Sequence, residues 1–390
     1  MSGCHGSAVK PRVLFILSGP IFEVRQRHFE ELSRTFSGCI FTSSQIAEIR
    51  AVRAVGDFSF HCIGYIYRFK TWSNLSLLLH ALAFCLRCRL RHERYDLVAT
   101  YDPLKTGLIG MLCSSILRAR FAPEVNGVYT SPAEYLDGRG TFSTRIRSLV
   151  YPRLERLVLK NADGAKTLFP CQLEPFSDIL QGKVIRCFPN NVAIDRFLAL
   201  DEDADSTEVL FVGFPFWRKG VDILIAAFKE VAAEFPAWRL NILGWLNPAE
   251  LQDAIGGHPQ IRHTPAVLPR DMPGEIGRCA ILVLPSRSEA MGRVLVEAMA
   301  AGKPRIGANI DGIPTVIADG IDGLLFAAED VSDLATKLRM LMADSQLRES
   351  LGRAARLRAR REFSSARYFA NISDYYTAII QSAGRDDRSR

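Results

Sequence analysis

The stretch ILVLPSRSEAMGRVLVEAMAAGKPRIGANIDGIPTVIADGIDG, residues Ile281–Gly323, decides the fold. Its first five residues form a short apolar run that ends at Pro285, which predicts a buried parallel strand. A polar loop follows. The helix-favouring segment Val294–Ala301 is then stopped by Gly302 and a proline two residues later, which is typical of a helix C-terminus. The sequence therefore predicts the order strand, loop, helix.

Two carboxylates flank the predicted helix start, Glu289 in the loop and Glu297 about one turn inside the helix. The first amides of a helix have no partners within it and attract phosphate. Each carboxylate can accept hydroxyl hydrogen bonds, so a diphosphate with a hydroxylated ring on either side, such as a nucleotide sugar, would satisfy both. The alternative is that Glu297 forms a solvated surface pair with Arg293, four residues before it.

The stretch resembles the donor-site signature of glycosyltransferase family 4 (glycosyl transferases group 1), the retaining enzymes of the GT-B fold. The resemblance rests on Pro285-Ser286, Glu289 and Glu297 with seven residues between them, Ala298-Met299-Ala300, Gly302, Pro304, Gly312-Ile313-Pro314, Asp319-Gly320 and Gly323-Leu324-Leu325. It implies an α/β fold with two Rossmann-like, doubly wound parallel-sheet domains that face a central cleft.

A second match follows the predicted strand Val209–Gly213, where Lys219-Gly220 and Asp222 resemble the family's phosphate-binding element. The family's arginine position holds Phe214, and Arg218 is an alternative source of that charge. The resemblance implies that Glu289 and Lys219 are catalytic. It also implies donor contacts from Gly19, Asn126, Gly213, Arg218, Lys219, Glu289, Ala290, Met291, Gly292, Arg293, Val294, Leu295 and Glu297.

The resemblance also implies a role for each polar group. Glu289 would hold the sugar hydroxyls and favour positive charge at the anomeric carbon, Glu297 would hold the ribose, and Lys219 with the amides of residues 292–295 would stabilise the departing diphosphate. That phosphate would itself accept the acceptor's proton. Asn126 stands where many relatives carry a histidine, and it cannot carry a proton at neutral pH. No metal or other cofactor is expected, because no cluster of aspartates suggests a bound metal, which agrees with the family's usual metal independence.

Two further positions leave alternatives open. Trp245 ends the predicted strand Leu240–Gly244, where it would either support a nucleotide base or pack in the interior. The helix predicted for Trp72–Leu90 is apolar on one side and basic toward its end, so it would either lie on a membrane surface or cover the first domain's sheet.

The predicted domain organisation follows the family. We expect an acceptor-binding Rossmann-like domain over residues 1–198, a linker over 199–207, a nucleotide-sugar-binding domain over 208–365, a helix over 366–383 that crosses back to the first domain, and a disordered tail over 384–390.

Composition and charge bound the remaining possibilities. The chain has 390 residues, 48% of them apolar, and nine scattered cysteines, which favours a globular protein in a reducing cytoplasm. Residues 1–200 hold 26 Lys and Arg against 16 Asp and Glu, whereas residues 201–390 hold 23 against 26. The basic half is either an ordinary solvated surface or attracts an anionic one, such as the inner membrane face. No nucleic-acid-binding pattern is present, and neither is an export or membrane-spanning segment.

Together these features predict a retaining glycosyltransferase of the EC 2.4 class. The donor would be a UDP- or GDP-linked sugar. The hydroxyl acceptor would be a glycan or a polyprenyl-diphosphate-linked intermediate in exopolysaccharide, capsule or lipopolysaccharide synthesis. The protein would work in the cytoplasm or on the inner face of the membrane. Two alternatives stay open, a GT-B nucleotide-sugar epimerase and a catalytically degenerate binding protein.

Overall fold

The computed structural model describes residues 9–17, 23–45, 54–65, 70–135, 142–200 and 206–382. Three predictions fall wholly or partly outside these ranges: the turn at Gly19, most of the linker over 199–207, and the tail over 384–390.

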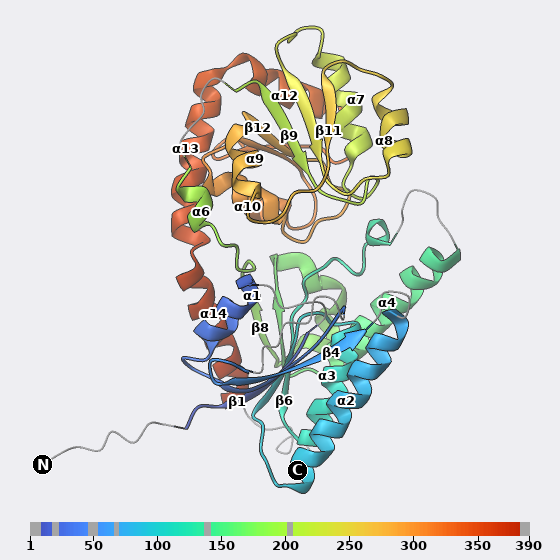
Figure 1. Cartoon of the computed structure of the whole chain (residues 1–390), viewed down its shortest axis with the longest axis vertical. Helices are drawn as coiled ribbons and strands as arrows, with labels where there is room; N and C mark the ends of the chain where they lie inside the picture. The colour runs from blue at the N-terminus through green and yellow to red at the C-terminus, as the bar shows by residue number, and fades with distance from the viewer. Residues whose placement is uncertain are drawn as a thin grey trace, which may run out of the picture.

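The chain forms two domains, each built on a six-stranded sheet with helices on its faces (Figure 1). The first domain contains β1 (Arg12–Ile16), α1 (Glu23–Leu32), β2 (Ser37–Gln45), β3 (Ala54–Val55), β4 (Phe58–Tyr65), α2 (Lys70–Leu90), β5 (Leu97–Thr100), α3 (Lys105–Leu117), β6 (Arg120–Pro123), the 3-10 helix η3 (Pro132–Glu134), α4 (Phe142–Asn161), β7 (Gly164–Thr167), the 3-10 helix η4 (Pro170–Phe176), α5 (Ser177–Leu180), β8 (Val184–Cys187) and α6 (Asp195–Leu198). The second domain and the final helix contain β9 (Glu208–Val212), α7 (Val221–Val231), β10 (Arg239–Leu243), α8 (Pro248–Ile255), β11 (Ile261–Thr264), α9 (Met272–Arg278), β12 (Ile281–Leu284), α10 (Arg293–Ala300), β13 (Arg305–Ala308), α11 (Ile313–Val316), β14 (Leu324–Phe326), α12 (Val331–Ala343), α13 (Ser345–Glu362) and α14 (Ser365–Gln381).

The second sheet has the order β11-β10-β9-β12-β13-β14, and all its strands are parallel. All four residues of β12 are buried, as expected for a strand that is covered on both faces. The strand order reverses between the neighbours β9 and β12, and ligands of such sheets bind beyond the carboxyl ends of the strands at this switch point. The predicted strand, loop and helix are thus confirmed as β12, its following loop and α10.

The first sheet has the order β3-β4-β2-β1-β5-β6, parallel except for the short antiparallel pair β3-β4. A parallel bridge between Glu124 and Lys166 continues it into the β7-β8 pair. One face packs against α2, α3 and the end of α4, and the other packs against α1 and α14. Buried residues of α2, including Leu77 and Ala81, face the sheet, so this helix does cover it as one alternative predicted.

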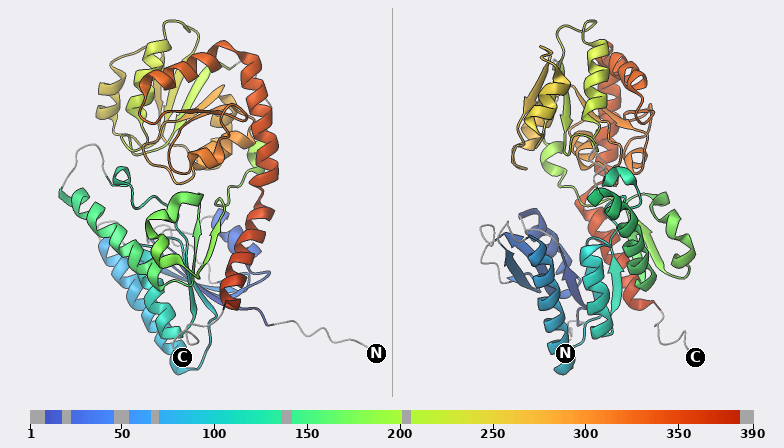
Figure 2. Two further views of the ribbon diagram at one scale, coloured as in Figure 1. Left: turned by 180° about the vertical axis from the view of Figure 1, so that it is seen from behind. Right: turned by 90° about the vertical axis from the view of Figure 1, so that its right-hand side faces the viewer.

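The last two helices connect the domains, and Figures 1 and 2 show them running along one edge of the molecule. α13 lies against α10, where a Cβ on Gly352 would come 2.0 Å from the carbonyl oxygen of Gly302. α14 then packs on the first sheet, and the Tyr376 hydroxyl donates to Glu124 Oε1 at 3.1 Å. The C-terminal segment of the described chain is therefore part of the first domain's core.

Glu155, on the inner side of α4, is a buried carboxyl group without a compensating charge. Its side chain is 2% exposed, and its Oε2 has no hydrogen-bond partner in the part of the chain that the structure describes. Burial disfavours the charged form and raises the pKa of Glu155 to about 8. The unfolded chain releases this proton at a lower pH, so stability falls as the pH rises from the unfolded pKa toward the folded one.

We expect Glu155→Gln, which keeps the shape but cannot ionise, to be more stable than the natural chain at pH 8 by up to about 4 kcal/mol, given about 1.4 kcal/mol per unit of pKa. The difference should vanish near pH 4, where both side chains are neutral. Thermal unfolding of both chains between pH 4 and pH 8 measures it. The exposed Glu230→Gln is the matched control, and parallel pH profiles for Glu155→Gln and the natural chain would contradict the expectation.

Candidate active site

The loops that follow β9 and β12 meet beyond the switch point of the second sheet. Gly220, in the loop after β9, has φ +67°, and a Cβ there would lie 2.0 Å from the carbonyl oxygen of Pro285 in the loop after β12. The Arg287 amide also donates to the Arg218 carbonyl at 2.8 Å. Only glycine permits the first of these contacts, so the sequence brings the two loops into direct contact.

Arg287 fastens these loops together. Its guanidinium donates to both carboxylate oxygens of Asp222, at 2.8 and 2.7 Å, and to the Trp217 carbonyl at 2.6 Å. Its Nε is 3.3 Å from a carboxylate oxygen of Glu329, and the guanidinium lies 4.7 Å from the centre of the Trp217 ring. Burial alone would lower the pKa of Arg287, but the hydrogen bonds and charges of Asp222 and Glu329 raise it. The pair with Asp222 is bidentate, which fixes its geometry.

Lys219 and Glu289 meet at the junction of the two loops, where the Lys219 ammonium donates to Glu289 Oε2. The Lys219 and Glu289 side chains are 14% and 15% exposed, respectively. The Lys219 stem passes beside Gly213, where a Cβ would lie 3.5 Å from Lys219 Cγ, an ordinary contact distance. The Glu289 amide donates to Asp311 Oδ2 at 3.1 Å, and its carbonyl accepts from the Gly312 amide at 3.0 Å. The two predicted catalytic residues, 70 positions apart in the sequence, are thus in contact.

Backbone amides without a partner gather at the start of α10. Gly292 precedes the helix with φ +73°, and the Leu295 amide donates to the Gly292 carbonyl at 2.8 Å. Of the four amides predicted for phosphate binding, those of Gly292, Arg293 and Val294 have no acceptor among the described residues, whereas the amide of Leu295 is already used.

Glu297 lies on the buried side of α10. Its Oε1 accepts from Arg293 Nε at 2.9 Å, so the predicted i,i+4 pair forms. However, Glu297 is only 7% exposed, and burial raises the pKa of its carboxyl group despite the opposing charge of Arg293. The pair is therefore not an ordinary solvated surface bridge, because one partner is nearly enclosed.

Ala290 and Met291, predicted to contact the donor, are both buried in the loop between Glu289 and α10. Met291 lines a cavity of about 460 Å³ between the domains, which also involves the α13–α14 junction. Lys219 and Glu289 do not line this cavity. The candidate site is therefore the region around Lys219 and Glu289 at the carboxyl ends of β9 and β12, and not this cavity.

Arg218 reaches across to the first domain. Its Nη1 donates to both oxygens of Glu134 in η3, at 2.8 and 2.9 Å, and the two side chains are 23% and 21% exposed. Burial raises the pKa of Glu134, and the Arg218 charge opposes this shift. Lys219 and Glu289 also act electrostatically on Glu134, so it lies near the catalytic pair. Sequence reasoning missed Glu134, which is 84 positions from Arg218 and has no local motif.

The aromatic residues at the rim are accessible. Trp245, at the end of β10, is 75% exposed, so the alternative of a buried packing role is wrong. Its ring lies 5.8 Å from that of Phe214, which occupies the family's arginine position and is about half exposed. No charged group stands at position 214, and Arg218 is occupied by Glu134.

Asn126 belongs to a row of hydrogen bonds in the first domain, at the end of β6. Its Nδ2 donates to the Tyr101 carbonyl at 2.8 Å, and its Oδ1 accepts from Asn190 at 3.0 Å. Asn190 in turn accepts from Lys166, which is fully buried and donates to Glu124 at 3.1 Å. Within the described ranges, no hydrogen bond joins Asn126 to Lys219 or Glu289. Gly19 lies outside those ranges, and no three metal-ligating side chains gather within them.

Residues 196–358 match the model of the family described as glycosyl transferases group 1. The second domain belongs to this family. Relatives of the chain include the D-inositol 3-phosphate glycosyltransferases of Corynebacterium kroppenstedtii (32% identical, covering 45% of this chain and 41% of that protein) and Streptomyces avermitilis (31% identical, covering 54% and 50%). Sulfoquinovosyl transferase SQD2 of Arabidopsis thaliana is 34% identical over 36% of this chain and 28% of its own length. The match thus spans half or less of the length of each of these relatives.

Solved structures resemble both domains of the chain together. Sucrose-phosphate synthase of Thermosynechococcus elongatus has a TM-score of 0.76 at 19% identity, covering 96% of this chain and all of that one. The lipopolysaccharide glycosyltransferase WaaG has a TM-score of 0.68 at 18% identity, covering 94% and 99%. HepE of Anabaena, solved in complex with UDP-glucose, has a TM-score of 0.71 at 16% identity, covering 95% and 100%. These similarities confirm the predicted GT-B fold.

Gly292 and Gly257 form a matched pair for testing the start of α10. Both have φ near +70°, but a Cβ on Gly292 would lie 2.9 Å from side-chain atoms of Leu284 and Leu295, whereas one on Gly257 would meet nothing within 4 Å. Alanine should cost about 1–2 kcal/mol at either site from the backbone alone, and about 1–3 kcal/mol more at Gly292 from crowding. Denaturant unfolding of the two variants measures the difference, and equal losses would contradict it.

The pair Arg218–Glu134 can be tested by a double-mutant cycle. We expect Arg218→Ala and Glu134→Ala each to lower the melting temperature by a few degrees, and the double variant to lower it no further than the more damaging single change, because the remaining partner is already unpaired. The exposed pair Arg339–Glu234 is the control and should show weak coupling. Additive losses at Arg218 and Glu134 would show that the two residues act independently.

Proposed function

We propose that the protein is a retaining glycosyltransferase that moves a sugar from a nucleotide-diphosphate donor to a hydroxyl acceptor. The observation that carries the proposal is the contact between Lys219 and Glu289 at the switch point of the second sheet. A cation and a carboxylate, delivered by separate loops to the edge where parallel sheets bind ligands, suit a substrate with a phosphate beside a hydroxylated ring. The family of the second domain supports the same reading.

Donor binding would rearrange the charged pair. A diphosphate beside the free amides of Arg293 and Val294 attracts the Lys219 ammonium, which releases the Glu289 carboxylate to accept hydrogen bonds from the sugar. The buried Glu297 carboxylate would take the ribose hydroxyls in place of part of its contact with Arg293. The exposed Trp245 ring offers a stacking surface for the base. Each protein charge would thus exchange one partner for another rather than lose one.

Transfer would depend on stabilising the leaving diphosphate and excluding water. Lys219 and the two amides stabilise the charge that develops on the phosphate, and Glu289 favours positive charge at the anomeric carbon. The departing phosphate accepts the acceptor's proton on the same face, so no protein base is required. Asn126 is held by its hydrogen bonds to the Tyr101 carbonyl and Asn190, and it would orient the hydroxyl acceptor. Arg218, paired with Glu134, would hold the domains together over the reacting groups rather than replace the arginine missing at Phe214.

Comparisons narrow the substrates that we propose. HepE structures contain UDP, UDP with glucose, or UDP-glucose, which supports a UDP-linked sugar over a GDP-linked one. WaaG acts in lipopolysaccharide biosynthesis, which supports a glycan or lipid-linked acceptor in cell-envelope polysaccharide synthesis. The protein would meet such an acceptor at the inner face of the membrane, and it would need no metal.

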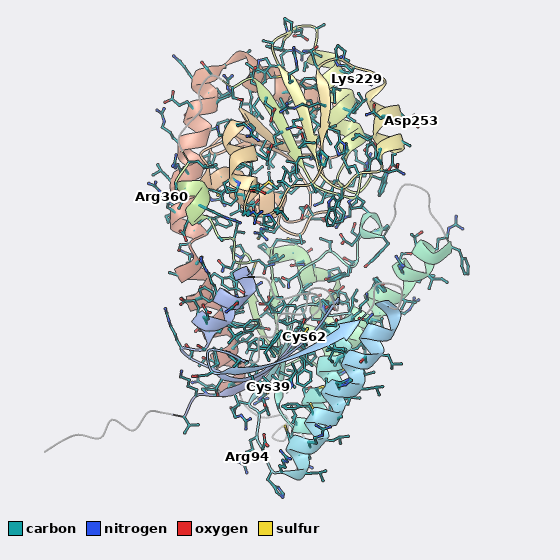
Figure 3. The ribbon with its side chains drawn as sticks, in the orientation of Figure 1. Cys39, Cys62, Arg94, Lys229, Asp253 and Arg360 are labelled. Carbon is teal, nitrogen blue, oxygen red and sulfur yellow. The ribbon has the colours of Figure 1, made fainter. Side chains whose placement is uncertain are left out.

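The test is thermal unfolding with UDP, GDP, ADP and their glucose or mannose conjugates. We expect a uridine nucleotide to raise the melting temperature, and Lys219→Met to remove most of that shift because the phosphate loses its cation. Lys229→Met is the matched control, since Lys229 lies on the outer side of α7, away from the strand ends, as Figure 3 shows. If no nucleotide shifts the folded protein, the degenerate binding protein becomes the better account.

Glu289→Gln separates binding from chemistry. This variant should keep most of the nucleotide shift but lose at least a hundredfold in sugar transfer or slow donor hydrolysis, because the neutral amide no longer favours charge at the anomeric carbon. Product analysis distinguishes the alternatives. A free or transferred sugar supports a transferase, whereas an intact nucleotide sugar with one inverted stereocentre in the sugar would show an epimerase.

A further inference from the structure

Exposed apolar side chains are concentrated on three adjacent helices of the first domain. Among the described residues, 17 large apolar side chains are exposed, and ten of them belong to α2, α3 and α4. The ten are Leu75, Leu79, Leu86, Leu90, Leu112, Phe142, Ile146, Leu149, Val150 and Leu157. Single exposed leucines are common, but a concentration on neighbouring elements marks an interaction surface.

The spacing of these residues places them on the outer side of each helix. On α2 the leucines at 75, 79, 86 and 90 recur at intervals of four and seven residues, so they form one stripe. That stripe is opposite Leu77, Ala81 and Cys85, which pack on the sheet. Each of the stripes on α2 and α4 covers 15 residue steps, or about 22 Å of helix.

The three helices stand side by side, so their outer sides form one surface. α3 packs between α2 and α4, and Figure 1 and the right-hand view of Figure 2 show the three helices as a layer along one side of the first domain. On α4, Phe142, Ile146, Leu149 and Leu157 point away from the buried side that carries Glu155 and Val158. We call this surface the α2–α4 face.

The helices of the α2–α4 face are predominantly basic, although Asp178 of the neighbouring α5 pairs with Arg156 of α4. The three helices contain nine lysine and arginine residues and a single carboxylate, Glu155, which is buried. Arg145, Arg147 and Arg153 are exposed between the apolar residues of α4. Arg94, just beyond α2, projects into solvent at the lower end of the layer in Figure 3. The face therefore combines an apolar stripe with cations and presents no exposed acidic side chain from the helices themselves.

We propose that the α2–α4 face docks on a lipid bilayer that contains anionic headgroups. Apolar side chains would enter the acyl boundary while the arginines contact lipid phosphates, as in helices that lie in the membrane interface. Within the described residues no helix has the length and apolar content to cross a bilayer, so docking would be peripheral. This extends the lipid-linked acceptor of the proposed function, but it rests on a surface separate from the catalytic pair.

Two other occupants fit the face less well. A second copy of the chain would bring cations against cations in a symmetric contact. A single-stranded nucleic acid would need aromatic rings for base stacking, whereas nine of the ten exposed residues are aliphatic. The mixture of aliphatic side chains and arginines matches the acyl and phosphate layers of a membrane surface.

The experiment is co-sedimentation of the full chain with phosphatidylcholine vesicles, with and without about one third phosphatidylglycerol. We expect binding to the anionic vesicles that weakens with salt, and little binding to the neutral ones. The double variant Leu79→Glu with Leu149→Glu should partition at least tenfold less. Its matched control, Ile321→Glu with Leu357→Glu, changes equally exposed aliphatic residues of the second domain and should bind like the natural chain.

A charge variant completes the test. Arg145→Glu should bind anionic vesicles several-fold more weakly with a smaller salt dependence, whereas Arg360→Glu, which Figure 3 places on α13 of the second domain, should not. The proposal would be overturned if the natural chain failed to bind vesicles or bound neutral vesicles equally well. It would also be overturned if the double variant of the α2–α4 face and the control double variant of the second domain lost binding equally. So would dimer formation or nucleic-acid binding through this face without vesicle binding.

The vesicle assay needs no donor, so its result is independent of transferase activity. The nucleotide-induced rise in melting temperature serves as a second readout, because the double variant of the α2–α4 face should retain it if the fold is intact. A chain that binds vesicles but no nucleotide would keep the docking proposal and refute the proposed function, and the reverse result would do the opposite.

Discussion

The candidate site depends on the bidentate ion pair between Arg287 and Asp222. Neither residue is at the catalytic contact, yet the pair joins the loop that carries Glu289 to the loop and helix start that carry Lys219. An arginine with a single partner would leave both loops free to shift. Here the guanidinium also contacts the Trp217 carbonyl and Glu329, so its orientation is determined from several sides. The loops held in this way are the ones that bring Lys219 and Glu289 into contact.

Much of the second domain could be predicted from local patterns. The ends of β12 and α10 follow from Pro285 and Gly302, because proline and glycine act through backbone geometry that any fold must respect. Glu289 and Lys219 were marked by motifs of the family. By contrast, the sequence indicates only a polar loop around Arg287. Its partner Asp222 lies 65 positions earlier, and such a pair leaves no periodic signal in the sequence.

The first domain was harder to predict, because its motifs are short and its contacts are distant. Glu134 acquires its role only when η3 approaches Arg218 of the other domain. The exposed stripe of α4 was missed for another reason: an amphipathic pattern shows that a helix has two sides, but it does not show whether a further layer covers the apolar residues. For α2, the sequence left sheet packing and membrane contact open. In the structure one side of α2 packs on the sheet, and the opposite side carries exposed leucines.

The donors and acceptors in its hydrogen-bond row explain how the Asn126 side chain is oriented. Lys166 can only donate, so the Asn190 oxygen must face it, and the Asn190 amide nitrogen must then donate to the Asn126 oxygen. Asn126 is thereby left with its nitrogen toward the Tyr101 carbonyl, which is the orientation that the structure shows. Burial lowers the pKa of Lys166, and the Glu124 carboxylate opposes this shift.

The same row of hydrogen bonds connects Asn126 to α14, the helix that returns from the second domain to the first. Tyr376 of α14 donates to the Glu124 oxygen that Lys166 does not use, so the helix that returns from the second domain helps to fix the charge beneath Asn126. On the other face of the sheet, α2–α4 carries the exposed apolar and basic surface. One face of the first sheet is thus covered by α1 and α14, and the helices on the other face carry exposed apolar and basic residues, so the carboxyl edge is the side of the sheet that remains for the candidate site.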